Sequence, residues 1–203
     1  MNPVLILIAG PNGAGKSTFY QEQLAHSSFP FINADLIAKE VFGNQDPENA
    51  LVAAKLAESL RQEKVASGNS FIFETVLSDP AGAKIEFLKK AQEAGFIVEA
   101  HFIGIASPIL SQARVIHRVQ SGGHDVPDEK IRSRYPRVMA NLQRLIPVAD
   151  RLTIYDNSEV DRPLRPLARF QNGALLALAS ELPAWVDFLN LPNLTSTETK
   201  TLS

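Results

Sequence analysis

The residues with the clearest chemical potential form a short glycine-rich segment near the N-terminus. Glycines let the backbone curl so that successive N–H groups point at phosphate oxygens, while a lysine reaches the β- and γ-phosphates. A hydroxyl placed directly after that lysine can ligate Mg²⁺. The pattern G-x-x-x-x-G-K-[ST] is complete here, over Gly10, Pro11, Asn12, Gly13, Ala14, Gly15, Lys16 and Ser17, with Thr18 just behind. A buried strand is expected before it and a helix after it, so we interpret it as a phosphate-binding loop rather than a plain glycine turn.

Two carboxylates follow later predicted strands. Asp35 comes after Phe31-Ile32-Asn33-Ala34, and Glu74 comes after Phe71-Ile72-Phe73. In a parallel sheet the carboxyl ends of the strands share one edge, so both acids should lie near the phosphate loop. Asp35 could accept the proton of an acceptor hydroxyl or orient that hydroxyl, and its alternative role is the N-cap of a helix starting at Leu36. Glu74 could bind magnesium, a magnesium-bound water or substrate, and its alternative is a solvated strand end.

A group of arginines flanks a glycine pair in the second half of the chain. Arginines on a mobile helical lid neutralise the charge that develops on a transferring phosphoryl group. Gly122-Gly123 could act as a hinge, and we interpret His124 as a turn residue. At least two of the arginines are expected on ordinary solvated helix faces. The group comprises Arg114, Arg118, Arg132, Arg134 and Arg137, of which Arg118 and one of Arg132 or Arg134 are the predicted phosphate contacts.

Strand and helix patterns alternate along the chain. Short apolar runs predict strands at 4–9, 29–32, 71–73, 96–105 and 152–155, and helices are expected at 16–25, 35–42 and 127–145. Three more helix starts carry a capping side chain before proline, at Asp46-Pro47, Asp79-Pro80 and Ser107-Pro108, and should run to about 67, 93 and 120. Alternation of this kind is typical of βαβ units on a parallel sheet.

The C-terminal part of the chain follows a different pattern. Asn172-Gly173 lies between two apolar runs, 164–170 and 174–178, and predicts a β-hairpin. A short helix should follow at 184–189. We therefore expect an α/β fold of the P-loop NTPase type, with three layers, a central mostly parallel sheet, a helical lid at about 107–145 and a C-terminal hairpin. The kinase-like domain should span 1–160, the hairpin and short helix 161–190, and a flexible tail 191–203.

Composition narrows the class of protein. The 203 residues carry a net charge of -2 and contain no cysteine, which excludes disulfides, cysteine-ligated zinc and thiol nucleophiles. The apolar run Val4 to Ala9 lacks the basic start of a signal peptide and is too short to span a bilayer. We expect a cytoplasmic protein without a membrane partner.

The surrounding motifs favour transfer of phosphate to a small molecule. The guanine-reading segment Asn-Lys-x-Asp is missing, which favours ATP over GTP, and the strand before Glu74 does not end in the Asp-Glu pair of motor and AAA-type ATPases. A phosphate loop, a carboxylate for the acceptor hydroxyl and lid arginines are what a small-molecule kinase needs. One Trp, three Tyr and no basic surplus argue against a nucleic-acid partner.

These segments together resemble the zeta-toxin-like P-loop kinases, over about residues 4 to 158. The matching segments are Ile8 to Thr18, Ile32 to Asp35, Phe73-Glu74-Thr75, Arg118-Val119, Gly122 to Pro127, Arg134-Tyr135 and Tyr155 to Ser158. The resemblance implies an ATP- and magnesium-dependent kinase acting on a sugar hydroxyl of UDP-N-acetylglucosamine, restrained by an antitoxin protein.

The resemblance also assigns roles to single residues. It makes Asp35 the catalytic aspartate, Lys16 the Walker lysine, and Arg118 with Arg132 or Arg134 the lid arginines. The acceptor side departs from the toxins, because Leu36 to Phe42 lacks their arginine and His-Pro, and Glu74-Thr75 replaces a glycine-containing strand end. The acceptor therefore stays open. Two other hypotheses are an ATP-binding regulator with slow or no hydrolysis and, last in rank, a nucleic-acid end kinase.

Overall fold

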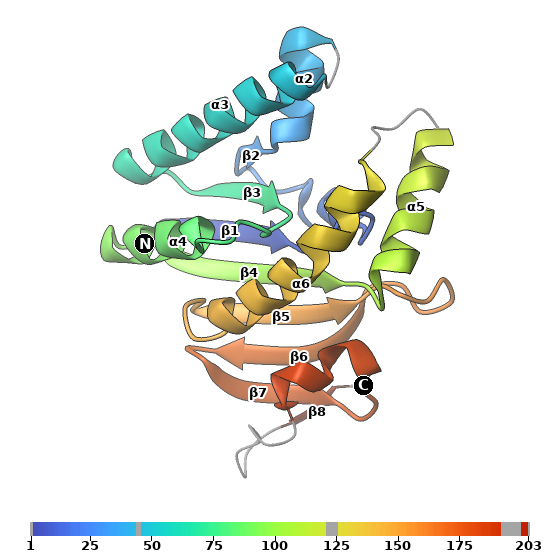
Figure 1. Ribbon diagram of the computed structural model, residues 1–203. Coiled ribbons are helices and arrows are strands. Elements are labelled where there is room, and N and C mark those ends of the chain that lie inside the picture. The colour runs from blue at the N-terminus through green and yellow to red at the C-terminus, as the bar shows by residue number, and fades with distance from the viewer. Residues whose placement is uncertain (1, 44–45, 121–125, 192–199, 203) are drawn as a thin grey trace.

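The computed structural model describes residues 2–43, 46–120, 126–191 and 200–202. Figure 1 shows a central sheet with helices on its faces and at one end of its strands. The strands are β1 (Val4–Ala9), β2 (Phe31–Ile32), β3 (Phe71–Thr75), β4 (Ile97–Gly104), β5 (Arg151–Asp156), β6 (Arg165–Gln171), β7 (Ala174–Ala179) and β8 (Lys200–Leu202). The helices are α1 (Lys16–Phe19), continued by a π-helical segment η1 (Tyr20–Leu24), then α2 (Ala34–Phe42), α3 (Pro47–Ala66), α4 (Ala83–Glu93), α5 (Pro108–Gln120), α6 (Asp128–Leu145) and the 3₁₀ segment η2 (Ala184–Leu189).

The strands form one sheet in the order β2-β3-β1-β4-β5-β6-β7-β8. β2, β3, β1, β4 and β5 run parallel to one another, whereas β6 pairs antiparallel with β5 and with β7, the latter as the predicted hairpin. In Figure 1 the parallel strands all point toward the side where α5 and one end of α6 lie. The mostly parallel α/β fold of the P-loop NTPase type is therefore confirmed. The loops that follow these strands lie along one edge.

Hydrophobic side chains fill both faces of the sheet. Alternate residues of β1 point to opposite sides, so Leu5 and Leu7 join the cluster that α4 and α6 cover, while Ile6 and Ile8 join a smaller one with Phe19 of α1. Strands buried on both faces read as continuous apolar runs, which explains why β1 could be placed from sequence. Among the helices of the described residues, none is both long enough and apolar enough to cross a membrane.

One predicted helix start was wrong, and one predicted cap lacks its side-chain hydrogen bond. The helix expected from Asp79-Pro80 begins only at Ala83, because Gly82 occupies the N-cap in the left-handed conformation. Asp79 still stabilises this end, since its carboxylate accepts a hydrogen bond from the Ala83 N–H. Asp46 does occupy the N-cap position of α3, but its side chain makes no capping hydrogen bond.

The expectation of a flexible tail over 191–203 was wrong at its end. Lys200–Leu202 forms β8 and pairs in parallel with Ala177 to Ala179 of β7. Without β8, β7 would present a row of unpaired backbone groups at the edge of the sheet, and such an edge attracts another strand. The proposed hinge Gly122-Gly123 and His124 lie outside the described residues, as do 192–199.

The buried side-chain amide of Asn141 holds the loop after β3 in place. Asn141 of α6 is 2% exposed, and its Nδ2 donates hydrogen bonds of 2.9 Å to the carbonyl oxygens of Leu77 and of Asp79.

We expect Asn141→Ala to lower the free energy of unfolding by about 1–3 kcal/mol, because both carbonyls lose their partner. Urea unfolding measures the change. Asn69→Ala, in an exposed turn, is the matched control and should leave the midpoint nearly unchanged, and an equal loss in both variants would contradict this role for Asn141.

Candidate active site

The glycine-rich segment forms a tight loop between β1 and α1. Gly10 has φ +145°, and a Cβ there would come within 2.1 Å of the Ile103 carbonyl oxygen on β4. Gly15 has φ +92° and caps the N-terminus of α1. Only glycine fits such conformations without strain, so the loop shape follows from these residue types.

Side chains from distant parts of the chain brace this loop. Asn157, directly after β5, donates a 2.8 Å hydrogen bond from Nδ2 to the Ala14 carbonyl oxygen. Ser111 of α5 donates its hydroxyl to the Asn12 carbonyl oxygen. Sequence reasoning did not assign either bracing role. The position of Asn157 at the end of a predicted strand was a usable signal, whereas nothing in the sequence distinguishes Ser111 from other helical serines.

Lys16 is buried within the loop, with 7% of its surface exposed. Its Nζ donates a 3.0 Å hydrogen bond to the Pro11 carbonyl oxygen and lies 3.8 Å from Glu74 Oε1. Burial lowers the pKa of Lys16, the carboxylates of Glu74 and Asp35 oppose that shift, and Arg118 and Arg134 reinforce it. A second anion, such as a nucleotide phosphate, would favour the charged amine further.

Glu74 connects the phosphate loop to Asn33, the residue directly before α2. Its Oε2 accepts hydrogen bonds from Ser17 Oγ at 3.0 Å and from Asn33 Nδ2 at 2.9 Å. The Glu74 side chain is 10% exposed, so the alternative of a solvated strand end was wrong. A hydroxyl and a carboxylate in contact are hard oxygen donors, which fits magnesium held mainly by nucleotide phosphates and water. In the described part of the chain, no group of three or more His, Cys, Asp or Glu could hold a metal by itself.

The carboxylate of Asp35 lies in the first turn of α2. Asn33 is the N-cap of this helix, because its Oδ1 accepts hydrogen bonds from the backbone N–H groups of Asp35 at 2.8 Å and Leu36 at 3.2 Å. The alternative that Asp35 itself caps a helix from Leu36 was therefore wrong. Asp35 also lines the cavity described next.

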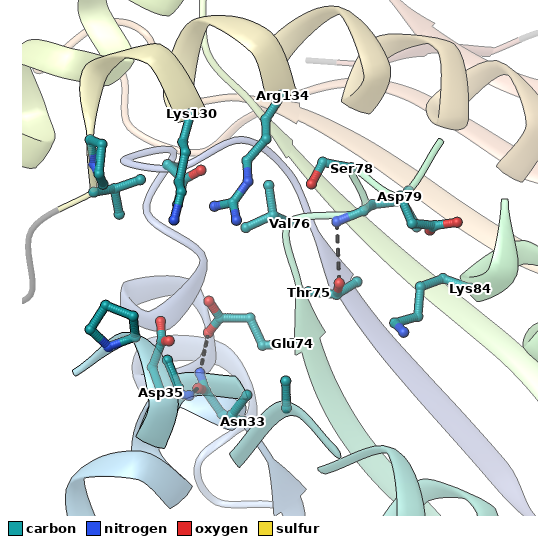
Figure 2. Close-up of a pocket in the computed structure, with 18 of the residues that line it drawn as sticks. Asn33, Asp35, Glu74, Thr75, Val76, Ser78, Asp79, Lys84, Lys130 and Arg134 are labelled. Carbon is teal, nitrogen blue, oxygen red and sulfur yellow. Dashed lines mark hydrogen bonds between the residues drawn. The ribbon is translucent and has the colours of Figure 1, made fainter. Parts of the chain in front are cut away.

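A cavity of about 770 Å³ opens beside the loop. Figure 2 shows Lys130 and Arg134 reaching down from α6, opposite Asp35 and Glu74. Asn12 of the phosphate loop also lines this space. A pocket of this size suits a small-molecule ligand, and here it joins the loop to a carboxylate and two cations.

The five arginines of the predicted lid have different surroundings. Arg134 lines the cavity, and burial lowers its pKa, with Arg137 adding to the shift and Asp35 opposing it. Arg118 lies on α5, where its charge acts on Lys16. Arg132 is not brought to the cavity, since it pairs with Asp128 at 2.8 Å and with Gln112 at 3.3 Å on the surface. Arg114 donates to the Ser158 carbonyl oxygen at 3.1 Å.

Three further cations line the cavity that sequence reasoning did not select. They are Lys130 on α6, Arg61 on α3 and Lys84 on α4. Lys130 lies one helical turn before Arg134, and that spacing was a usable signal. Nothing in the patterns of α3 and α4 marks Arg61 or Lys84 as different from exposed helix cations.

The sequence matches the AAA domain family over residues 5–143. It is also 33% identical over 134 residues to an uncharacterised protein of Haemophilus influenzae, covering 64% of this chain and 91% of that protein. The family match includes the phosphate loop, Asp35 and Glu74.

Two solved structures share the fold at low sequence identity. A structure of the PezAT chromosomal toxin-antitoxin system of Streptococcus pneumoniae is similar with a TM-score of 0.64 at 19% identity, covering 83% of this chain and 72% of that chain. A structure of AvrRxo1-ORF1:-ORF2 with ATP has a TM-score of 0.57 at 20% identity, covering 97% of this chain and 66% of that chain. At such identities the likeness establishes the fold.

Proposed function

The chain belongs to the AAA domain family, and from this premise we propose that it is an ATP-dependent phosphotransferase acting on a hydroxyl of a small acceptor. One observation carries the proposal: the Asp35 carboxylate lines the same cavity as phosphate-loop residue Asn12, with Arg134 on the opposite wall. A protein that only binds nucleotide does not require a carboxylate and an arginine on opposite walls of a cavity beside the phosphate loop. The name of the family is shared with AAA-type ATPases, but β3 ends in Phe73-Glu74-Thr75 rather than Asp-Glu.

The proposed reaction uses the groups that the cavity brings together. The acceptor oxygen attacks the γ-phosphorus, its proton passes to Asp35, and the bond from the γ-phosphorus to the β–γ bridging oxygen breaks to release ADP. Lys16 and Arg134 stabilise the negative charge on the transferring group. Magnesium, held beside Ser17 and Glu74, would supply further charge neutralisation on the phosphates. Arg118, the other arginine predicted from sequence, lies close enough to Lys16 to contribute.

The finer part of the proposal is a zeta-toxin-like reaction on a nucleotide sugar, for example a UDP-N-acetyl sugar. The fold likeness to the PezAT toxin-antitoxin system supports the toxin-like reaction, and the ATP in the AvrRxo1-ORF1:-ORF2 structure supports ATP as the phosphate donor. An antitoxin protein is then a proposed partner. Leu36 of α2 and Thr75 of β3 occupy positions where the sequence departs from the toxins, so the acceptor must be identified by experiment.

Transfer from γ-labelled ATP tests this proposal. The purified protein is incubated with magnesium, labelled ATP and a panel of hydroxyl acceptors that includes UDP-N-acetylglucosamine. We expect label in an acceptor and ADP formation that rises with acceptor concentration. ATP binding with no acceptor-dependent ADP on any compound would favour the ATP-binding regulator instead.

Two arginines on α6 offer a matched comparison. We expect Arg134→Gln to reduce kcat by about 10²–10³-fold, because it removes a donor to the transferring phosphoryl group. Arg132→Gln should change kcat by no more than about twofold, as a surface substitution away from the cavity. Steady-state kinetics with the identified acceptor measures both. Equal changes in kcat in the two variants would contradict a role for Arg134 in phosphotransfer.

A further inference from the structure

The cavity continues past the reacting groups to a second end. Figure 2 shows Asp35 at one side of the view and Lys84 at the other, with Glu74 and Thr75 of β3 between them. The second end is lined by Ser78 and Asp79 of the loop after β3, by Lys84 of α4 and by Arg61 of α3. None of these residues has a role in the reaction described above. We propose that Arg61 and Lys84 form an anion subsite, so that the acceptor carries a phosphate or carboxylate group in addition to its reacting hydroxyl.

Of the two cations, Arg61 gives the stronger support for an anion subsite. It is 6% exposed, and within the described residues no hydrogen bond or ion pair of its guanidinium is found, although the charge of Glu58 on the same helix acts on it. Its Cζ lies 5.2 Å from the ring centroid of Phe73 and 5.9 Å from that of Phe87. The two rings pack against the guanidinium, and Arg61 also lines the cavity, where a planar cation suits a planar anion. Buried charges are normally paired, so an unpaired buried arginine that lines a cavity points to a ligand.

Lys84 adds a second positive charge at the same end. Burial lowers the pKa of Lys84, Arg61 adds to the shift, and the carboxylates of Glu58 and Asp79 oppose it. Asp79 forms no ion pair with Lys84 in the described residues: its Oδ1 accepts a hydrogen bond from the Ala83 N–H, and its Oδ2 is buried without a hydrogen-bond partner. The charges of Glu58 and Asp79 act on these two cations without forming an ion pair with either in the described residues, and an incoming anion at the cavity would relieve the repulsion between Arg61 and Lys84.

The wall of this end is rigidly built. Asn141 fixes the carbonyl groups of Leu77 and Asp79, and Thr75 Oγ1 accepts a 3.2 Å hydrogen bond from the Leu77 N–H. A preorganised wall lowers the entropic cost of binding a small ion. Because the same cavity reaches Asp35, one small molecule can place its anionic group on Arg61 and its hydroxyl at the carboxylate. This assignment of acceptor class rests on the proposed phosphotransfer, while the anion subsite can be tested without it.

Binding of simple anions tests the subsite directly. The phosphate loop is first filled with magnesium and a non-hydrolysable ATP analogue, and inorganic phosphate or malonate is then titrated by calorimetry. We expect saturable binding that weakens about tenfold in Lys84→Gln and in Arg61→Met, each of which removes one charge-assisted contact. Met at position 61 keeps an unbranched apolar side chain over the rings, and undiminished binding of the ATP analogue reports an intact fold. Lys55→Gln and Lys90→Gln, exposed on the same two helices, should bind as the wild type does.

The outcomes separate the subsite from the proposed reaction. Absence of saturable phosphate and malonate binding in the wild type, or binding that Lys84→Gln and Arg61→Met both leave unchanged, overturns the subsite. Phosphotransfer confined to neutral acceptors overturns the subsite and keeps the kinase. Anion binding lost in both variants, with no transfer to any acceptor, keeps the subsite and rejects the kinase. A preference for phosphate-bearing or for carboxylate-bearing acceptors identifies which anion the subsite serves.

Discussion

Lys16→Met is expected to reduce phosphotransfer by at least about 10³-fold and to weaken ATP binding, because it removes the cation that the phosphate loop holds inside itself. The Nζ of Lys16 contacts the Pro11 carbonyl and lies beside Glu74, so the amine is held within the loop by the chain itself. Methionine keeps an unbranched apolar chain in the buried position, and Glu74 retains the hydroxyl of Ser17 and the amide of Asn33 as donors. The loss should therefore appear in function rather than in folding.

Titration with a fluorescent ATP analogue and acceptor-dependent ADP release measure the two effects of Lys16→Met separately. Lys39→Met, an exposed lysine on α2, is the matched control and should keep both properties. If Lys16→Met bound nucleotide and transferred phosphate as the wild type does, the segment would be only a glycine turn. Thermal unfolding close to that of the wild type would show that the comparison concerns folded protein.

The features that sequence predicted well depend on short spacing along the chain. The phosphate loop is a local pattern, and β1 is apolar throughout because both of its faces are covered. The position of Asp35 at the active edge followed from one rule, that parallel strands share the edge where their carboxyl ends lie. The structure agrees with that rule, since Asn12, Asp35 and Glu74 line one cavity.

The features that sequence could not predict depend on how helices rotate and pack. Arg132 and Arg134 are two residues apart, so on a helix they point about 200° away from each other, and only the packed position of α6 decides which one reaches the cavity. Arg61 and Lys84 come from different helices and meet through tertiary packing. The strand β8 likewise depends on the free edge of β7, which is a property of the assembled sheet and not of residues 200–202.

Asp35→Asn should separate nucleotide binding from phosphotransfer more cleanly than any other substitution in the chain. The amide cannot take a proton from the acceptor hydroxyl at neutral pH, so we expect kcat to fall by about 10²–10⁴-fold. Helix α2 should persist, because the side chain of Asn33 provides the cap, while the first-turn charge of Asp35 is worth about 0.3–1 kcal/mol. ATP affinity should change little, since phosphate binding belongs to the loop that contains Lys16.

Rapid-quench transfer assays with saturating acceptor measure the chemical step in Asp35→Asn, and the same ATP titration measures binding. Glu40→Gln, an exposed acid on the same helix, controls for the loss of one negative charge from α2. A large fall in kcat with unchanged ATP affinity in Asp35→Asn alone places this carboxylate at the acceptor hydroxyl. Full transfer in Asp35→Asn would assign proton removal to another group, with the Glu74 carboxylate, in contact with Ser17 and Asn33, the next to test. Because the two carboxylates line one cavity, the double substitution would then show whether they act on the same step.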